Sequence, residues 1–173
     1  MDDECPDPQE GELTSRVPLE DDLVALCREL NQRGAKYVVV GGFAIMQAGY
    51  PRTTGDVDLL IATDLENEAR VFQALQTLPD RCVAELEPGD VSKYVVVRVA
   101  DEILVDLMAT ASGIDYAEAS LSIVHQEVGG VSIPFASPEL LWRMKRHTHR
   151  IKDGPDLLFL REWFKARGQT PPE

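Results

Sequence analysis

Two aspartates at the start of an apolar run are the first residues of this sequence that could do chemistry. Asp56 and Asp58 flank Val57 and lead into a run that ends at Ile61. Residues i and i+2 of a β-strand point to the same face and lie roughly 6.5–7 Å apart. We therefore expect the two carboxylates to project together, while Val57 and Leu59 enter the core.

A third aspartate stands inside another apolar run. Asp106 lies in Leu104–Met108, where alternation places it on the face opposite Val105 and Leu107. A carboxylate in such a strand is costly to bury unless it is paired or bound to a metal. If this strand lies beside the 57–62 strand, three carboxylates converge, and one or two hard divalent cations would relieve their repulsion. Magnesium prefers such a site, in which water and substrate phosphates supply the remaining ligands.

A pair of glycines offers a second kind of chemistry. Gly41 and Gly42 end the β-branched run 37–40 and open a short apolar helix. A turn of this kind lets backbone N–H groups approach a phosphate closely, at the positive end of the helix dipole. The pair is not a Walker A loop, because Gly-Lys-Ser/Thr is missing, and it is not Gly-x-Gly-x-x-Gly.

A further group of charged residues lies near the carboxy-terminal end: Lys145, Arg150, Lys152, Asp153 and Asp156. On a helix, Lys145 could reach a nucleoside triphosphate as a point charge. Cationic side chains near a helix C-terminus are also stabilising through the helix dipole alone, so both interpretations stay open. His147 and His149 point to different sides of a helix, and no Cys or Ser has a convincing base partner. Neither a histidine metal pair nor a covalent nucleophile is expected.

The elements that position these residues follow from apolar periodicity and from turn residues. We expect helices over roughly 19–32, 43–48, 63–78, 138–150 and 156–167, strands over 37–40 and 57–62, and hairpins over 93–108 and 123–135. Thr63 and Glu66 read as a capping box, and Ser137-Pro138 as a helix start. This order predicts an α/β (α+β) fold: a mixed sheet with helices on one side and a carboxy-terminal helical pair.

Length and charge set the domain organisation. The chain has 173 residues, of which 44% are hydrophobic and 27% charged, so one globular domain is expected. The net charge of −13 is uneven, because residues 1–22 hold nine acids against Arg16 alone, whereas residues 143–167 hold eight Lys or Arg against three acids. We interpret residues 1–18 as an acidic flexible arm and 19–173 as a single domain whose carboxy-terminal helices span 138–167. Anionic partners stay open.

The sequence also bears on location. No stretch approaches the ~20 apolar residues of a membrane helix, and the acidic start Met1–Glu12 is the opposite of a signal peptide. Cys5, Cys27 and Cys82 are odd in number and lack Cys-x-x-Cys spacing. We expect a cytoplasmic protein without a membrane partner.

Four of these segments together resemble the minimal nucleotidyltransferase (polymerase-beta-like) superfamily. They are Gly41–Ala44, Arg52–Ile61, the strand around Asp106 and the stretch from Ser137 to Asp156. Within the superfamily the chain is most similar to the abortive-infection, toxin-type (AbiEii-like) nucleotidyltransferases, whose helical motif has a Lys followed by Arg-Lys-Asp.

The resemblance implies transfer of a nucleoside monophosphate from a nucleoside triphosphate such as ATP to an acceptor, with release of pyrophosphate. Asp56 and Asp58 would hold two magnesium ions, and Asp106 would share one and is a candidate to accept the proton of the attacking hydroxyl. Gly41 and Gly42 would face the triphosphate.

The same resemblance makes Arg52, Thr53, Lys145 and Asp153 candidates for nucleotide contacts or for support of the site. The acceptor could be RNA, a transfer RNA end or a protein side chain, and a cognate antitoxin-type protein is a candidate partner. Two alternatives stay open. One is a non-catalytic nucleotide-binding or toxin–antitoxin partner module on the same fold, and the other is a magnesium-dependent phosphohydrolase.

Overall fold

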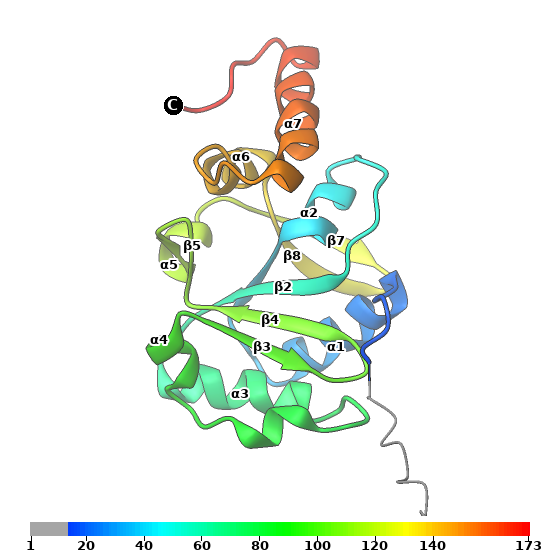
Figure 1. Cartoon of the computed structure of the whole chain (residues 1–173), viewed down its shortest axis with the longest axis vertical. Helices are drawn as coiled ribbons and strands as arrows, with labels where there is room; N and C mark the ends of the chain where they lie inside the picture. The colour runs from blue at the N-terminus through cyan, green and yellow to red at the C-terminus, as the bar shows by residue number, and fades with distance from the viewer. Residues whose placement is uncertain (1–13) are drawn as a thin grey trace, which may run out of the picture.

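A six-stranded mixed sheet forms the centre of the molecule, which a computed structural model describes for residues 14–173 (Figure 1). The strands are β1 (Tyr37–Val40), β2 (Asp56–Ile61), β3 (Val96–Ala100), β4 (Leu104–Met108), β7 (Ile123–Val128) and β8 (Val131–Ala136). Their order across the sheet is β3-β4-β2-β1-β8-β7. β2 runs parallel to β4, and β1 to β8, whereas the other neighbours are antiparallel. The expected mixed α/β class is confirmed.

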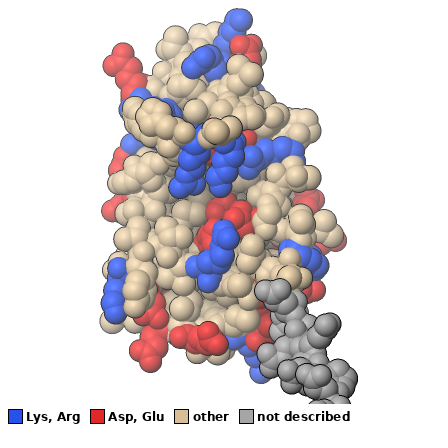
Figure 2. Space-filling view, in the orientation of Figure 1, with Lys and Arg blue, Asp and Glu red and all other residues tan. Residues whose placement is uncertain are grey.

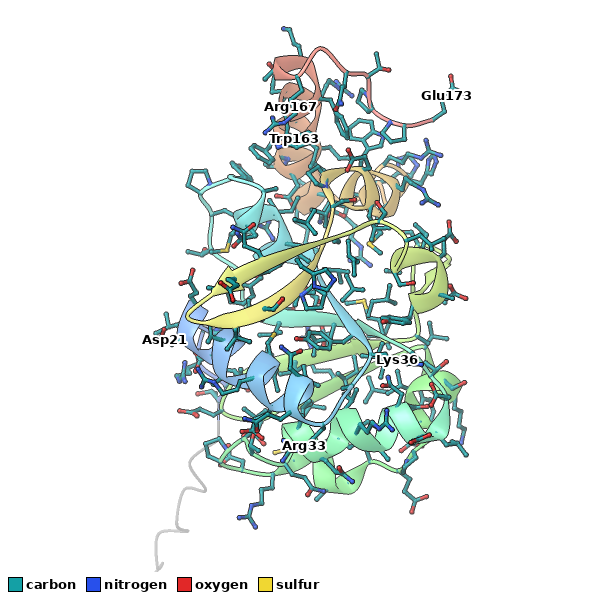
Figure 3. The ribbon with its side chains drawn as sticks, turned by 180° about the vertical axis from the view of Figure 1, so that it is seen from behind. Asp21, Arg33, Lys36, Trp163, Arg167 and Glu173 are labelled. Atoms are coloured by element: carbon teal, nitrogen blue, oxygen red, sulfur yellow. The ribbon has the colours of Figure 1, made fainter. Side chains whose placement is uncertain are left out.

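The longer helices form two groups around this sheet. α1 (Glu20–Gln32) and α3 (Leu65–Leu75) contact each other, and Figure 3 shows them together when the molecule is seen from behind. α2 (Gly41–Gln47), α6 (Pro138–Lys145) and α7 (Gly154–Ala166) gather at the other end, where α6 contacts both α2 and α7. The expected carboxy-terminal helical pair is therefore observed as α6 and α7, which extend the molecule beyond the sheet.

Strand alternation separates the core from the polar face of β2 and β4. Val57 and Leu59 of β2 are fully buried, as are Val105 and Leu107 of β4, and they belong to one continuous hydrophobic core. The residues between them in sequence project to the opposite face of each strand. The expected placement of Val57 and Leu59 in the core is confirmed.

Helix starts follow local hydrogen-bonding chemistry. Ser137 caps α6 by accepting a hydrogen bond from the Leu140 N–H, as expected from the Ser-Pro sequence. The expected Thr63–Glu66 capping box was wrong by one residue, because Asp64 is the N-cap of α3 and accepts from the Asn67 N–H. Either residue type is a good cap, so the pattern alone did not separate them.

Short elements join the larger ones. They are η1 (Cys82–Glu85), α4 (Asp90–Tyr94), β5 (Thr110–Ala111), β6 (Ile114–Asp115), α5 (Tyr116–Ala119) and η2 (Ile151–Asp153). The strand expected from Lys93 begins only at Val96, because the preceding residues form α4 around the buried Val91. The helix expected to reach Arg150 ends at Lys145.

The amino-terminal residues are described from Thr14 onward, so residues 1–13 of the expected arm lie outside the described part. Residues 14–18 run beside the β3–β4 link. The Arg16 N–H donates to the Glu102 carbonyl at 2.8 Å, and the Ser15 hydroxyl donates to the Asp101 carbonyl at 2.6 Å. Among residues 14–173, no helix has the length and apolar character needed to cross a membrane.

Candidate active site

Three aspartates meet on the polar face of β2 and β4. The parallel pairing of these strands sets Asp58 directly beside Asp106, and Asp56 lies two residues earlier on the same face of β2. One carboxylate oxygen from each of the three lies within 4.8 Å of the other two. The convergence expected from the sequence is therefore observed.

The proximity of these acids changes the protonation of Asp58. Burial and the negative charges of Asp56 and Asp106 raise the pKa of Asp58 to about 7, while the positive charges of Lys145 and Lys152 act in the opposite direction. Oxygen donors that repel one another at this spacing are the ligand set that a hard divalent cation takes. The three side chains fit a magnesium ion by this chemistry.

An arginine that sequence reasoning did not single out lies against the same acids. Arg98 stands opposite Asp106 in the β3–β4 pairing. Its Nε donates to Oδ1 of Asp106 and its Nη2 to Oδ2, each at 2.8 Å, and Nη2 also donates to Oδ2 of Asp56 at 3.0 Å. The tight link between β3 and β4 could have revealed it, because a short hairpin link fixes the register that pairs these two residues.

The triad lies in a cleft of about 730 Å³. All nine residues that the resemblance makes candidates for the site line it: Gly41, Gly42, Arg52, Thr53, Asp56, Asp58, Asp106, Lys145 and Asp153. The wall also includes Thr54 and Arg98. Figure 2 shows the acidic group near the middle of this face with basic side chains around it.

The glycine pair lets the backbone lie against the acids. Gly41 has a φ of +65°, and a Cβ there would come within 2.0 Å of Oδ2 of Asp58. A Cβ on Gly42 would come within 2.4 Å of Oγ1 of Thr54. Both positions therefore exclude any side chain, and the loop before β2 closes directly onto the start of α2.

A buried ion-pair group supports the cleft wall opposite the triad. Lys145 Nζ donates to Oδ1 of Asp153 at 2.8 Å and lies 3.1 Å from Oδ2 of Asp156, which is fully buried. Arg52 Nη1 lies 3.2 Å from the other oxygen of Asp156. These two contacts of Asp156 are ion pairs without hydrogen-bond geometry. Lys145 is thus paired with buried carboxylates of the protein, so its interactions are more than the helix dipole alone.

The partner of Lys145 is held as a carboxylate. Burial acts to raise the pKa of Asp153, but hydrogen bonds from Lys145 and from the Thr148 hydroxyl, at 2.6 Å, keep that pKa below its usual value. The Thr148 N–H donates to the Lys145 carbonyl at 3.1 Å, and the Thr148 hydroxyl lies 3.0 Å from the same carbonyl. Asp153 therefore orients Lys145 and closes the turn between α6 and η2.

Two basic residues of the cleft stand outside these internal pairs. Arg150 and Lys152 are exposed and line the cleft, and no ion pair engages either of them among residues 14–173. Lys152 is near enough to act on the Asp58 carboxyl. The cleft therefore joins an acidic floor to a basic rim that is free to take an anion.

The family model described as nucleotidyl transferase of unknown function (DUF2204) matches residues 19–168 of this chain. No curated protein matches it. Among solved structures, the chain is similar to an antigenic nucleotidyltransferase-like protein from Paracoccidioides brasiliensis, with 19% identity, a TM-score of 0.49 and coverage of 83% of this chain and 74% of that chain. It is also similar to a protein from Thermotoga maritima provisionally described as a nucleotidyltransferase, with 16% identity, a TM-score of 0.45 and coverage of 87% of this chain and 98% of that chain.

Proposed function

Since the chain belongs to the family of nucleotidyl transferases of unknown function (DUF2204), we propose that it is a metal-dependent nucleotidyltransferase. It moves a nucleoside monophosphate from a nucleoside triphosphate to an acceptor hydroxyl. The observation that carries this proposal is the convergence of Asp56, Asp58 and Asp106, whose oxygens lie within 4.8 Å of one another in the cleft. The basic rim beside them supports it, because a triphosphate is a polyanion.

Each part of the cleft has a task in this reaction. Asp56 and Asp58 would hold two magnesium ions, and Asp106 would share one of them. Such ions neutralise charge on the phosphates and align the attacking and leaving oxygens. Arg150 and Lys152 bind the anionic triphosphate, and Asp106 takes the proton of the attacking hydroxyl.

The remaining cleft residues hold this arrangement in place. Gly41 lets the backbone lie against Asp58, and Gly42 lets it lie against Thr54, so the backbone at the start of α2 lines the cleft and faces the triphosphate. Arg52 and Lys145 meet at Asp156 and fix the opposite wall. Thr53 is exposed at the edge of the cleft, where it can contact a bound nucleotide.

The test is incorporation of radiolabelled nucleotide in the presence of magnesium. We expect Asp56→Ala and Asp58→Ala to lower incorporation by about 10²-fold or more, because each removes a ligand of the charge-stabilising ions. Glu127→Ala, which removes an exposed carboxylate of β7 away from the cleft, is the matched control and should keep full activity. Label that persists in both aspartate variants would reject the proposed site.

One observation favours a second candidate, a nucleotide-binding module without catalysis on the same fold. Arg98 already supplies positive charge to Asp106 and Asp56, so the acids are partly neutralised without a metal. Calorimetry with magnesium and a triphosphate separates the two candidates. Binding without incorporation of label favours the module, whereas binding with incorporation favours the enzyme.

The acceptor class is the finer part of the proposal. RNA, a transfer RNA end and a protein side chain are all open, and a toxin role with an antitoxin-type partner rests on the resemblance to the abortive-infection branch. Incubation of the protein with labelled triphosphate and either total RNA or a cell protein extract tests this. Label that is lost on treatment with nuclease identifies a nucleic acid acceptor. Label that is lost on treatment with protease identifies a protein acceptor.

A further inference from the structure

Arg98 holds the position that a cation would take at the acidic triad. Its guanidinium donates two parallel hydrogen bonds of 2.8 Å to the two oxygens of Asp106 and a third of 3.0 Å to Asp56. Two of the three carboxylates therefore share one positive charge. The third, Asp58, receives no hydrogen bond from Arg98, and burial and its acidic neighbours raise its pKa.

Arg98 and a metal would compete for the same carboxylates. The guanidinium already engages three of the four carboxylate oxygens of Asp56 and Asp106, so a metal that binds both residues must share these oxygens with it or take them from it. An arginine and a divalent ion both carry positive charge, so they also repel each other at this distance. It is therefore unfavourable for Arg98 and a divalent ion to bind the carboxylates of Asp56 and Asp106 at the same time.

The position of Arg98 leaves it free to move. Its side chain is 53% exposed, and it reaches the acids from β3, which is the edge strand of the sheet. The side chain is thus held by its ion pairs rather than by packing. Displacement of Arg98 costs its three charge-assisted hydrogen bonds but no apolar packing, and a divalent ion that takes the same oxygens offsets that cost.

We propose that Arg98 is an intramolecular counter-cation of the triad, which a divalent metal must displace in order to bind. This rests on the proposed function in that the same three acids are the metal ligands. Arg98 is a positioning residue here: it keeps the acids close together in the metal-free protein, and it weakens the metal affinity of the site. The inference concerns metal binding itself and does not depend on catalysis.

The test measures Mn²⁺ binding to the full chain by calorimetry, in the absence of nucleotide. We expect Arg98→Gln to bind Mn²⁺ about five- to tenfold more tightly than the wild type, the effect of removing one partly exposed competing ion pair. Arg16→Gln is the matched control. Arg16 is also a partly exposed arginine that contacts two acids, Asp22 and Glu102, and its removal changes the net charge equally. It should leave Mn²⁺ affinity unchanged.

A second measurement follows the wild-type arginine directly and does not require the variant to fold. The Arg98 Nε–H group gives a signal in a nitrogen-15 spectrum of the labelled protein. We expect Mg²⁺ to remove the signal of the hydrogen-bonded form over the same concentration range in which Mg²⁺ binds to the protein. A signal that keeps its position at saturating Mg²⁺ would overturn the inference.

The outcomes separate this inference from the proposed function. Equal Mn²⁺ affinity in Arg98→Gln and wild type, together with loss of binding in Asp58→Asn, overturns the role of Arg98 and leaves the metal site standing. Weaker binding in Arg98→Gln overturns it as well, because Arg98 would then assist the metal. No Mn²⁺ binding in either protein overturns both the metal site and the inference.

Discussion

The backbone at Gly41 approaches Asp58 so closely that no side chain fits between them. A Cβ there would lie 2.0 Å from Oδ2 of Asp58, and the φ of +65° is in the left-handed region. Gly41→Ala therefore carries a backbone cost of about 1–2 kcal/mol and must also push Asp58 away from the triad. We expect it to lower the free energy of unfolding and to abolish Mn²⁺ binding.

Gly113→Ala is the matched control for this prediction. Gly113 has a φ of +77°, but a Cβ there would meet no atom of residues 14–173 within 4 Å. The Gly113→Ala variant should lower the free energy of unfolding by the backbone cost alone, and its affinity for Mn²⁺ should not change. Urea unfolding and calorimetry measure the two quantities. If Gly41→Ala loses no more stability than Gly113→Ala and still binds Mn²⁺, the close approach at Gly41 has no bearing on the site.

Asp101 gives the fold a pH dependence that belongs to a single side chain. It is 3% exposed, and its carboxylate accepts hydrogen bonds from the N–H groups of Asp80, Cys82 and Glu102. Burial acts to raise the pKa of Asp101, but these three donors outweigh burial and lower it. Because its folded pKa lies below its unfolded pKa, the stabilisation is full above pH about 4 and is lost as the pH falls below that value.

Asp101→Asn tests this assignment. An amide cannot accept from all three N–H groups without turning one of its own donors toward them, so we expect a loss of about 2 kcal/mol at pH 7. The difference between wild type and variant should shrink as the pH is lowered from 5 to 3 in denaturant unfolding. A difference that stays constant across this range would show that packing, rather than the carboxylate charge, is responsible.

At the residue level, the sequence predicted the position of a side chain where the geometry of a single strand is enough to place it. Asp56 and Asp58 share a face because of the period of a strand, and Asp106 was conspicuous as an acid between apolar residues. Arg98 was missed because an arginine in a strand is common, and its meaning depends on the register with β4. The pairing of Arg52 with Asp156 was missed for the same kind of reason, since these residues are far apart in the chain.

At the level of elements, a single buried carboxylate connects the loop before β2 to the carboxy-terminal helices. Asp156 of α7 is fully buried and contacts Arg52 from that loop and Lys145 from α6. Removal of the acid leaves Arg52 without this partner in a partly buried site, beside Lys145, which keeps its pair with Asp153. Asp156→Ala should therefore lower the free energy of unfolding by about 3 kcal/mol, at the lower end for a broken buried ion pair.

Glu162→Ala on the same helix is the control. Glu162 is exposed, and its carboxylate lies 4.0 Å from Lys165, a pair that contributes little. Its removal should change the free energy of unfolding by less than about 0.5 kcal/mol. Thermal or urea unfolding measures both variants. If Asp156→Ala is as stable as the control, the ion pairs of Asp156 do not contribute to holding α6 and α7 against the loop before β2.

The elements that the sequence missed are those set by tertiary contacts. The valines at 95–97 are typical of a strand, yet Val95 has a φ of 68° and ends α4, whose Val91 is buried. The end of α6 has no Gly or Pro to mark it. Instead, the Thr148 N–H donates to the Lys145 carbonyl and the Thr148 hydroxyl donates to Asp153, and these bonds end the helix. Neither feature has a local sequence signal.

At the scale of the whole molecule, the net charge of −13 hides a basic rim at the cleft. A triphosphate that approaches such a protein is repelled over most of the surface and attracted where Arg150 and Lys152 stand free. If the proposed function holds, their charges act on binding more than on the chemical step, because each would contact the anion in the ground state and in the transition state alike. We therefore expect the rim to determine the affinity for the triphosphate.

The double variant Arg150→Gln/Lys152→Gln should raise KM for the triphosphate about tenfold and change kcat by less than about twofold. In the wild type, KM should rise as salt is raised from 0.05 to 0.3 M, because screening weakens the attraction, and the double variant should show a smaller rise. Steady-state kinetics of nucleotide incorporation give both quantities.

The matched control separates the local rim from overall charge. Arg28→Gln/Lys165→Gln removes two exposed cations from α1 and α7, outside the cleft, and produces the same net charge as the first double variant. It should leave KM unchanged within about twofold, because charges more than one Debye length (~10 Å at 0.1 M salt) from the substrate are screened. If both double variants raise KM equally, the triphosphate responds to total charge, and Arg150 and Lys152 have no special place in its recognition.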